Sequence, residues 1–508
     1  MPLPTADTTD FFPPLRPAND DPALLQGTQS WSYAALDARS KSLASGLLHD
    51  CRDLEEERIA FFMPASVDYV TALLGVWRAG GIAVPLNVAA AMPELEHVLT
   101  TAGVRRLLIG AGPMASAGTP LRVLCARLDI AVLTLETVLQ ENLTPLPLLD
   151  PGRRALMLFT SGTTNKPKGV VSTHRNIRAQ ISTLLEAWAW QRSDALPLFL
   201  PLHHIHGIIN ILCCALWAGA RVELFVKFDA DAVLTAVANG AYTVFMAVPT
   251  VYVLILRHLS TLPGPDSQRI TTGFAAMRLN VSGSAACPVT LFQQWQALTG
   301  QTLLERYGMT EIGMGIANPY RGERRAGAVG LPLPGVEVAL HGEDGRVIAG
   351  DGEPGEIRIR GDNVFLEYWN NPQATAQSFR AGWFCTGDIA VREDGYYRIM
   401  GRASVDIIKS GGYKLSALEI EDVLLAHAAI AECAVIGIED ATWGELVSAF
   451  VVLRPGTSLS LAALKHWCEG RLSPYKVPRQ LQVLTALPRN AMGKVTKPAL
   501  KALVPPAP

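Results

Sequence analysis

Short apolar runs that alternate with helical patterns limit the fold of this chain more than any other feature. Ile59–Phe62 and Ile82–Pro85 have the length and composition of buried strands. Between them, Ser66–Ala79 has the pattern of a helix that ends at Gly80-Gly81. Such alternation predicts α/β layers with parallel strands. At 508 residues the chain is too long for one hydrophobic core, so we expect two or more domains.

Composition and charge exclude several classes of function. A net charge of −2 provides no electrostatic basis for binding nucleic acid. No uncharged apolar stretch has transmembrane length, and the acidic, proline-containing segment Met1–Asp21 resembles neither a secretory signal nor a transit peptide. The eight cysteines are scattered without a Cys-x-x-Cys pair, which argues against a disulfide framework and a zinc site. We therefore expect a cytoplasmic enzyme without a nucleic-acid or membrane partner.

A polar loop that follows a strand-like run is the first candidate site. The run Ala155–Phe159 leads into hydroxyl and glycine residues and then into two lysines around a proline. Glycine lets the backbone approach a polyphosphate, hydroxyl and N–H groups donate to phosphate oxygens, and Lys168 adds a positive charge. The spacing is not that of a Walker loop, and a polar surface turn is the alternative. The candidate ligands are Thr160, Ser161, Gly162, Thr163, Thr164 and Lys168.

A second polar motif follows the strand-like segment at Leu303–Glu305. Tyr307 can stack on adenine, Thr310 can contact the α-phosphate, and Glu311 can bind Mg²⁺, a hard cation that prefers oxygen ligands. Alone, the pattern Tyr-Gly-x-Thr-Glu is weak evidence. Together with the loop about 140 residues upstream it predicts a single nucleotide site, because both elements fit one nucleotide.

Two further segments carry side chains that suit a carboxylate. Three histidines occur at positions 203, 204 and 206, but no Cys, Asp or Glu lies nearby, so a carboxylate pocket is a more economical interpretation than a metal site. Arg278 begins a strand-like segment, where arginine is unusual. It either forms an internal ion pair with Asp or Glu or grips a second carboxylate of a substrate.

These motifs resemble those of the adenylate-forming superfamily, which includes acyl-CoA synthetases, luciferases and the adenylation domains of peptide synthetases. The resemblance covers about residues 30–502 and includes a third motif at Pro488–Val495. Asn165 stands where the family usually has glycine, and asparagine tolerates positive φ better than other non-glycine residues. Within the superfamily the malonyl-CoA synthetases are the most similar group, through segments such as Leu200–Gly207 and Asn318–Arg325.

The resemblance implies a large N-terminal domain of sheets flanked by helices and a small, mobile α+β C-terminal domain. We place them at residues 1–401 and 402–508. The hinge residue normally lies two places after Arg402, where this chain has Ser404, with Asp406 nearby. Lys494 would reach the acyl and α-phosphate oxygens during adenylation. The other half-reaction would use a face that binds coenzyme A, formed by Ser410, Gly411, Gly412, Tyr413 and Lys414.

The resemblance also assigns the remaining site residues. Asp388 and Arg402 would contact the ribose or a phosphate, and His204 would lie beside the acyl pocket. One wall of the adenine pocket would comprise Gly283, Ser284 and Ala285, and the rest of the nucleotide site would include Glu305, Arg306, Tyr307, Gly308 and Thr310. The residues predicted to contact the substrate carboxylate are His206, Arg278, Ser282 and Met309.

The implied reaction has two steps that consume ATP with Mg²⁺. A carboxylate attacks the α-phosphorus to give an acyl-adenylate and pyrophosphate, and the thiol of coenzyme A then displaces AMP. In a fatty-acid tunnel Arg278 would be an unpaired buried charge that costs several kcal/mol. We therefore predict an acid–thiol ligase for malonate, or for methylmalonate, that serves fatty acid metabolism as a monomer or weak homodimer. The alternatives are a ligase for another small acid, an enzyme that loads a carrier protein, and an AMP-binding protein with an inactive site.

Overall fold

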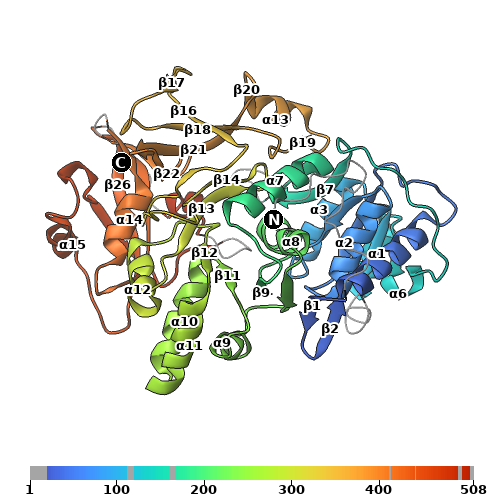
Figure 1. Cartoon of the computed structure of the whole chain (residues 1–508). Coiled ribbons are helices and arrows are strands. Elements are labelled where there is room, and N and C mark those ends of the chain that lie inside the picture. Colours follow the sequence, from blue (N-terminus) through green and yellow to red (C-terminus); the bar gives the residue numbers. More distant parts are fainter. Residues whose placement is uncertain are drawn as a thin grey trace.

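The chain folds into mixed sheets covered by helices, followed by a small C-terminal sheet with its own core (Figure 1). The structure is a computed structural model that describes residues 20–110, 119–160, 167–410, 413–440, 442–489 and 495–503. The architecture confirms the layered α/β class that the sequence predicts. Within these ranges, no helix combines the length and apolar character that a membrane span requires.

Seven strands form the sheet nearest the N-terminus, in the order β19-β8-β7-β4-β3-β5-β6. The five strands from β7 to β6 are parallel, whereas β8 is antiparallel to both of its neighbours. The strands are β3 (Arg58–Phe62), β4 (Ile82–Pro85), β5 (Arg106–Ile109), β6 (Ala131–Thr134), β7 (Arg154–Thr160), β8 (Lys168–Thr173) and β19 (Glu367–Tyr368). The associated helices are α1 (Tyr33–Leu48), α2 (Val67–Arg78), α3 (Met92–Ala102), α5 (Thr119–Arg127), α6 (Leu135–Val138) and α7 (His174–Ala187).

Alternate residues of these parallel strands enter different cores. Ile59 and Phe61 of β3 pack in one cluster with α1 and α2, whereas Ala60 packs in a second cluster with α3 and α5. Successive side chains of a strand point to opposite faces, so a strand covered by helices on both sides reads as a continuous apolar run. The sheet therefore explains why the apolar runs at 59–62 and 82–85 lack polar positions.

A second sheet and a smaller sheet beside it form the middle of the large domain. The second sheet contains β11 (Val244–Ala247), β12 (Leu279–Ser282), β13 (Leu304–Met309), β14 (Gly313–Ala317) and β15 (Leu331–Pro332). The smaller one contains β2 (Gln29–Ser32), β1 (Pro22–Gln26), β10 (Arg221–Leu224) and β9 (Ala195–Leu198). Their helices are α8 (Cys214–Ala218), α9 (Ala230–Ala238), α10 (Pro249–Thr261), α11 (Gly264–Ala276) and α12 (Val289–Thr299).

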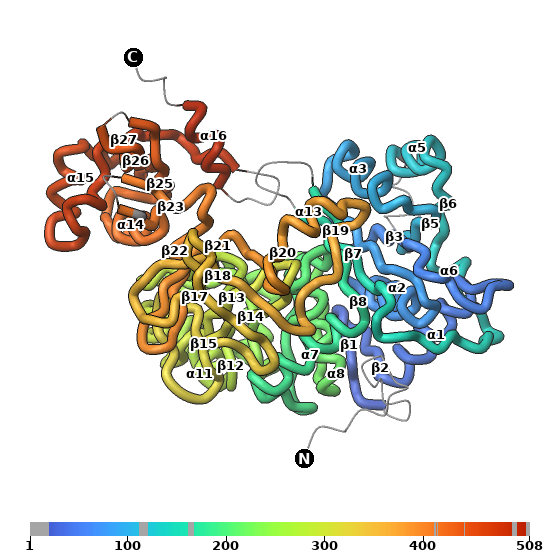
Figure 2. The backbone as a smooth tube through the Cα atoms, turned by 90° about the horizontal axis from the view of Figure 1, so that it is seen from above, coloured from blue at the N-terminus to red at the C-terminus, as the bar shows by residue number. Residues whose placement is uncertain are grey.

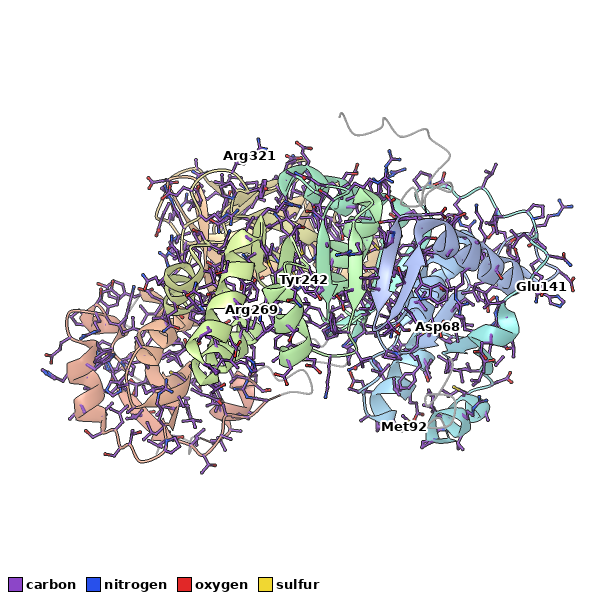
Figure 3. The ribbon with its side chains drawn as sticks, turned by 60° about the horizontal axis from the view of Figure 1, so that its bottom comes forward. Asp68, Met92, Glu141, Tyr242, Arg269 and Arg321 are labelled. Carbon is purple, nitrogen blue, oxygen red and sulfur yellow. The ribbon has the colours of Figure 1, made fainter. Side chains whose placement is uncertain are left out.

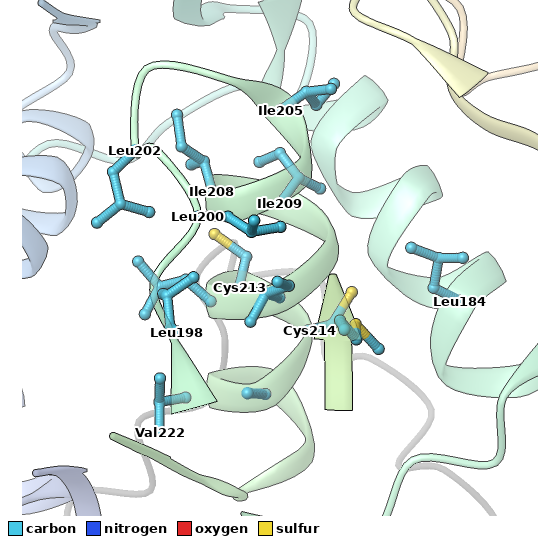
Figure 4. Packing of buried hydrophobic residues seen from close by; sticks show 14 of the residues in the cluster. Leu184, Leu198, Leu200, Leu202, Ile205, Ile208, Ile209, Cys213, Cys214 and Val222 are labelled. Carbon is cyan, nitrogen blue, oxygen red and sulfur yellow. The ribbon is translucent and has the colours of Figure 1, made fainter. Parts of the chain in front are cut away.

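A buried π-helix, His206–Cys213, lies between these sheets and continues into α8. All eight of its residues are buried, and Ile208 and Ile209 pack with Leu198, Leu200 and Leu184 (Figure 4). Because π-turns are uncommon and often accompany functional sites, the position of His206 at the start of this segment makes it a candidate functional residue.

Antiparallel strands complete the large domain and lead to the small one. Their sheet contains β16 (Glu337–His341), β17 (Val347–Ile348), β18 (Gly355–Arg360), β20 (Phe379–Arg380), β21 (Trp383–Glu393) and β22 (Tyr396–Arg402), with α13 (Pro372–Gln377) nearby. The C-terminal sheet contains β23 (Ile407–Ser410), β24 (Tyr413–Ser416), β25 (Ile430–Asp440), β26 (Gly444–Leu453) and β27 (Gln480–Val483), with α14 (Ala417–Leu425), α15 (Leu461–Cys468), a short 3₁₀ helix (Pro474–Lys476) and α16 (Lys497–Lys501). In Figure 2 this orange-to-red part lies at one end of the molecule, away from the blue N-terminal strands.

Helices α9 and α11 approach closely because a glycine faces the end of α9. A Cβ added to Gly273 of α11 would lie 2.1 Å from the carbonyl oxygen of Val237. On the same helix Arg269, labelled in Figure 3, donates a hydrogen bond to Asn239 at the end of α9 (3.3 Å). The backbone contact at Gly273 thus sets the distance between the two helices.

We expect Gly273→Ala to lower the free energy of unfolding by about 1–3 kcal/mol, because the methyl group forces α9 and α11 apart. Gly264→Ala is the matched control on the same helix, since a Cβ at Gly264 has no neighbour within 4 Å. Denaturant unfolding of both variants tests this expectation. Equal stability of the two variants would contradict it.

Candidate active site

A cavity of about 1680 Å³ lies where the large domain faces α14 of the small domain, and it contains most of the predicted site residues. Side chains from the ends of β7, β13, β21 and β22 and from the start of the π-helix line it. The predicted residues on its wall are Thr160, Lys168, His204, His206, Ser284, Ala285, Glu305, Arg306, Tyr307, Gly308, Met309, Thr310, Glu311, Asp388 and Arg402.

Several predicted residues are not on this wall or are not described. Arg278, Ser282, Gly283, Ser410 and Tyr413 do not line the cavity. Ser161, Gly162, Thr163, Thr164, Asn165, Gly411, Gly412 and Lys494 lie outside the described residues, as does the side chain of Lys414. The predictions for these undescribed residues stay predictions.

Arg306, His206 and Ser284 form a polar cluster on the cavity wall. Nη2 of Arg306 donates to Nδ1 of His206 (2.7 Å) and to Oγ of Ser284 (3.1 Å), and that Oγ lies 3.2 Å from the same histidine nitrogen. Burial, together with the Arg306 charge, holds the pKa of His206 well below its usual range, so the ring is neutral and its Nδ1 can accept. The sequence prediction placed Arg306 in the nucleotide site, and in the structure it contacts His206, which was predicted to contact the substrate carboxylate.

The Arg306 guanidinium is buried without an acidic partner. Burial lowers the pKa of Arg306 to about 9, and its Nε is buried without a hydrogen-bond partner. Among the described side chains, no carboxylate forms an ion pair with it. An uncompensated buried charge is costly, so this wall of the cavity suits an anionic group.

The prediction that Arg278 grips a substrate carboxylate is corrected by the structure. Its Nε and Nη2 donate to the two carboxylate oxygens of Asp194 (2.7 and 2.5 Å), and Nη1 donates to the carbonyl oxygen of Trp188 (2.8 Å). Its guanidinium also lies 5.3 Å from the ring centroid of Tyr320. Asp194, which precedes β9, takes the bidentate position that the prediction assigned to a substrate, and the structural ion pair is the correct alternative.

Ser282 also differs from its prediction. It is the last residue of β12, its side chain is fully buried, and it does not reach the cavity. The serine that does reach the cavity is Ser284, two residues later. Sequence reasoning assigned Ser284 to the adenine wall because the turn is rich in small residues, and nothing in the local pattern indicates a contact with His206.

Tyr307, Asp388 and Arg402 form the second polar cluster of the cavity. The Tyr307 hydroxyl donates to one oxygen of Asp388 (2.5 Å), and Nε of Arg402 donates to the other (3.1 Å). Burial raises the pKa of the Asp388 carboxyl, while Arg402 opposes this shift. The structure brings together the two residues predicted to contact the ribose or a phosphate, and it adds the Tyr307 hydroxyl to them.

Glu311 and Lys168 are connected by a tyrosine that sequence reasoning missed. The Tyr368 hydroxyl donates to Glu311 (2.9 Å), and Nζ of Lys168 lies 4.9 Å from the Tyr368 ring centroid. Tyr368 reaches the site because β19 pairs with β8, a long-range contact without a local signal. One buried carboxylate beside a cation fits a Mg²⁺ that keeps waters and phosphate oxygens as its other ligands; the described residues contain no group of three side chains arranged to hold a metal ion.

The turn between the domains is closed by Asp406. Oδ2 of Asp406 accepts from the N–H of Arg402 (3.0 Å), and Oδ1 accepts from Lys497 (2.6 Å). Lys497 is buried and also pairs with Glu421 (2.7 Å). Asp406, rather than Ser404, therefore makes the side-chain contacts across the predicted hinge.

Two residues of the predicted face for coenzyme A, Ser410 and Tyr413, do not line the cavity. The exposed Tyr413 ring stacks on Tyr475, with ring centroids 4.4 Å apart and an angle of 7° between the planes. Ser410 is buried at the end of β23. In this arrangement of the domains, α14 covers the cavity instead, and its Asp422 and Glu419 join Glu305 in the lining.

We expect Asp194→Ala to lower the free energy of unfolding by about 3–5 kcal/mol, because it leaves the Arg278 charge without its partner in a largely buried place. Denaturant unfolding measures the loss. Arg278→Ala should destabilise the protein as well, while the folded enzyme keeps its preference among carboxylic acids. If Arg278→Ala changed the preference among carboxylic acids, Arg278 would have to contact the substrate after all.

The pH dependence of stability should reveal the raised pKa of Glu305. Burial raises the pKa of Glu305 from 4.5 to about 8. Between these values the folded state holds a proton that the unfolded state has lost, so the free energy of unfolding falls as pH rises, on the order of 1 kcal/mol for each pH unit. Glu305→Gln should remove this part of the slope, and the exposed Glu141→Gln should not. Denaturation from pH 5 to 8 measures this slope. If the free energy of unfolding falls equally steeply with pH in Glu305→Gln and in the unchanged protein, the raised pKa of Glu305 is contradicted.

Known proteins resemble this chain over almost its whole length. Residues 15–369 match the family model described as AMP-binding enzyme, and residues 419–494 match the AMP-binding enzyme C-terminal domain. A mitochondrial malonate–CoA ligase of Mus musculus is 42% identical over 521 residues, which cover 95% of this chain and 88% of the mouse protein.

Two solved structures have the same fold. The ATP-bound MatB from Rhodopseudomonas palustris superimposes with a TM-score of 0.87 at 33% identity and covers 98% of this chain and 99% of that one. The o-succinylbenzoate CoA synthetase MenE from Bacillus subtilis, solved with its acyl-adenylate, has a TM-score of 0.81 at 28% identity and covers 94% and 95%.

Proposed function

Because this chain belongs to the AMP-binding enzyme family, we propose that it joins malonate to coenzyme A at the expense of ATP. Malonate attacks the α-phosphorus of ATP to give malonyl-adenylate and pyrophosphate. The thiol of coenzyme A then displaces AMP to give malonyl-CoA. The relatives support this activity through their names, malonate–CoA ligase in mouse and an ATP-bound MatB in a bacterium.

The observation that carries the choice of acid is the unpaired Arg306 guanidinium. Malonate has two carboxylates, and only one reacts with ATP. The other can pair with Arg306 beside His206 and Ser284, which removes the cost of the buried charge. We therefore transfer to Arg306, on β13, the argument that the sequence suggested for Arg278.

The rest of the cavity suits the triphosphate. Lys168 lies over the ring of Tyr368 and Glu311 accepts from its hydroxyl, so a phosphate chain with Mg²⁺ would meet a cation and a carboxylate there. Mg²⁺ would neutralise charge that otherwise repels an anionic nucleophile. Asp388 and Arg402 can hold the ribose, and Thr310 lies within reach of the phosphates on the same wall.

The two half-reactions need different groups at the same place. We propose that Lys494 serves adenylation and that residues 410–414 serve thioester formation after the small domain rotates about the turn at Asp406. The expected cytoplasmic location, the monomer or weak dimer, and the part in fatty acid metabolism stay predictions.

The other candidate functions have less support. A monocarboxylic acid would leave Arg306 unpaired in the closed cavity, which disfavours acetate, octanoate and benzoate. The relatives that resemble the chain are named as ligases for coenzyme A, which disfavours a carrier-protein thiol. Lys168, Glu311, Asp388 and Arg402 line the same cavity, which disfavours an inactive AMP-binding protein.

Pyrophosphate release with ATP, Mg²⁺ and coenzyme A tests the proposal on malonate, methylmalonate, acetate, octanoate and benzoate. We expect malonate to be preferred strongly over the monocarboxylic acids. Arg306→Met should lower kcat/KM for malonate by about 100-fold or more, because loss of a buried charge partner costs several kcal/mol.

The exposed Arg321→Met is the matched control and should leave the malonate kinetics unchanged (Figure 3). Preference of the unchanged protein for a monocarboxylic acid would contradict malonate as the substrate. An Arg306→Met variant with full malonate activity would contradict the role of this arginine.

A further inference from the structure

A histidine on α3 contacts the chain on both sides of the predicted phosphate loop. Nε2 of His97 donates a hydrogen bond to the carbonyl oxygen of Pro167 (2.9 Å), directly before β8 begins at Lys168. The same ring lies edge-on to Phe159 near the end of β7, with ring centroids 6.3 Å apart and planes at 82°. Phe159 pairs with Gly169 across the two strands, so one side chain connects the strand that enters the loop with the strand that leaves it.

The His97 ring has a second polar contact on its other side. Thr101, one turn later on α3, has its Oγ1 3.4 Å from Nδ1 of His97. A carbonyl oxygen only accepts hydrogen bonds, so Nε2 carries the proton, and Nδ1 is then the acceptor of the neutral ring. The Thr101 hydroxyl therefore favours the tautomer that the bond to Pro167 requires.

Helix α3 is a packed support for this contact. Its buried face shares one hydrophobic cluster with side chains of β7 and β8, through Leu95, Val98, Leu99, Met157 and Val171. Because these apolar contacts hold the helix against the strands, the hydrogen bond ties Pro167 to a fixed element rather than to an exposed side chain.

The bond acts on Lys168 through the peptide unit that joins it to Pro167. This unit is planar and trans, so when the Pro167 carbonyl points to His97 the N–H of Lys168 points the opposite way. Proline has no N–H, so the carbonyl is its one backbone group that can form a hydrogen bond. The contact thereby fixes the backbone from which the Lys168 side chain extends into the cavity, where its Nζ lies 4.9 Å from the Tyr368 ring centroid.

We propose that His97 is a positioning residue for the polyphosphate of ATP, because it holds the Pro167–Lys168 peptide in the orientation from which the Lys168 ammonium meets the phosphates. The inference rests on the proposed function and deepens it, since it adds to the nucleotide site a residue that does not itself line the cavity. No local pattern indicates this role, because His97 lies 70 residues before Pro167 in the chain.

Two substitutions of His97 separate the hydrogen bond from packing. His97→Leu keeps apolar bulk against Phe159 but removes the donor, whereas His97→Gln keeps an N–H donor and loses the ring. We expect His97→Leu to raise KM for ATP about fivefold, equivalent to about 1 kcal/mol, while KM for malonate stays within about twofold. His97→Gln should keep the KM for ATP of the unchanged protein. The exposed His466→Leu is the matched control and should change neither constant.

Nucleotide binding without turnover provides a second readout. ATP carries the polyphosphate that Lys168 would meet, whereas AMP has only the α-phosphate. In calorimetric titrations with Mg²⁺ and without acid or coenzyme A, His97→Leu should weaken ATP binding about fivefold and leave AMP binding within about twofold. If His97 served only stability, the variant would have a lower melting temperature and would bind ATP and AMP with equally altered affinity.

The outcomes distinguish this inference from the proposed function. If the unchanged protein prefers another acid, malonate as the substrate is contradicted, but the comparison of ATP with AMP still tests His97 because it needs no acid. Equal affinity for ATP in His97→Leu and in the unchanged protein overturns the role of His97 while the function stands. Equally weak ATP binding in His97→Gln and His97→Leu also overturns it, since the ring would then act through packing.

A third variant keeps the test decisive if His97→Leu does not fold. His97→Asn retains a polar side chain, but its amide ends about where Nδ1 lies and is too short to reach Pro167. It should therefore weaken ATP binding about fivefold and leave AMP binding within about twofold. Unchanged ATP binding in folded His97→Asn would overturn the inference.

Discussion

A positive charge, buried without a negative partner among the residues that the structure describes, is the constraint around which the cavity is arranged. Arg306 is carried on β13, the central strand of its sheet, so its backbone cannot move to relieve the charge. The π-helix contributes the neutral imidazole of His206, and the turn after β12 contributes the hydroxyl of Ser284. Gly283 in the same turn has no Cβ, which leaves room for the guanidinium. Each of these groups orients the guanidinium but leaves its charge uncompensated, and that remaining charge is the basis of the proposed preference for malonate.

Local patterns were sufficient for the fold class and for the nucleotide motifs. Apolar runs and helical spacing depend on neighbouring residues, and Tyr307, Thr310 and Glu311 are neighbours in one segment that the structure also places on the cavity wall.

The choice between Arg278 and Arg306 could not be made in this way. Arg278 immediately precedes β12, and Arg306 lies on the adjacent parallel strand β13. The contact of Arg278 with Asp194, 84 residues away in sequence, is what removes it from the site. Tyr368 was missed for the same reason, since it reaches Glu311 through the pairing of β19 with β8.

The domain turn connects the two parts of the site through a chain of hydrogen bonds. Asp406 accepts from the backbone of Arg402 on one side and from the buried Lys497 on the other, and Arg402 in turn contacts Asp388. A hydrogen-bonded path therefore runs from the cavity to the C-terminal helix through only four residues. Rotation of the small domain has to alter the first of these contacts, since the turn lies between the two residues.

Tyr307 and Arg402 together fix the orientation of the Asp388 carboxylate, since each donates a hydrogen bond to one of its two oxygens. A carboxylate oxygen has two acceptor sites, so each of these oxygens can still accept a hydrogen bond from a sugar hydroxyl. The two protein donors occupy the other sites and thereby limit the directions from which a hydroxyl can approach. The carboxylate therefore acts as a geometric template for the sugar.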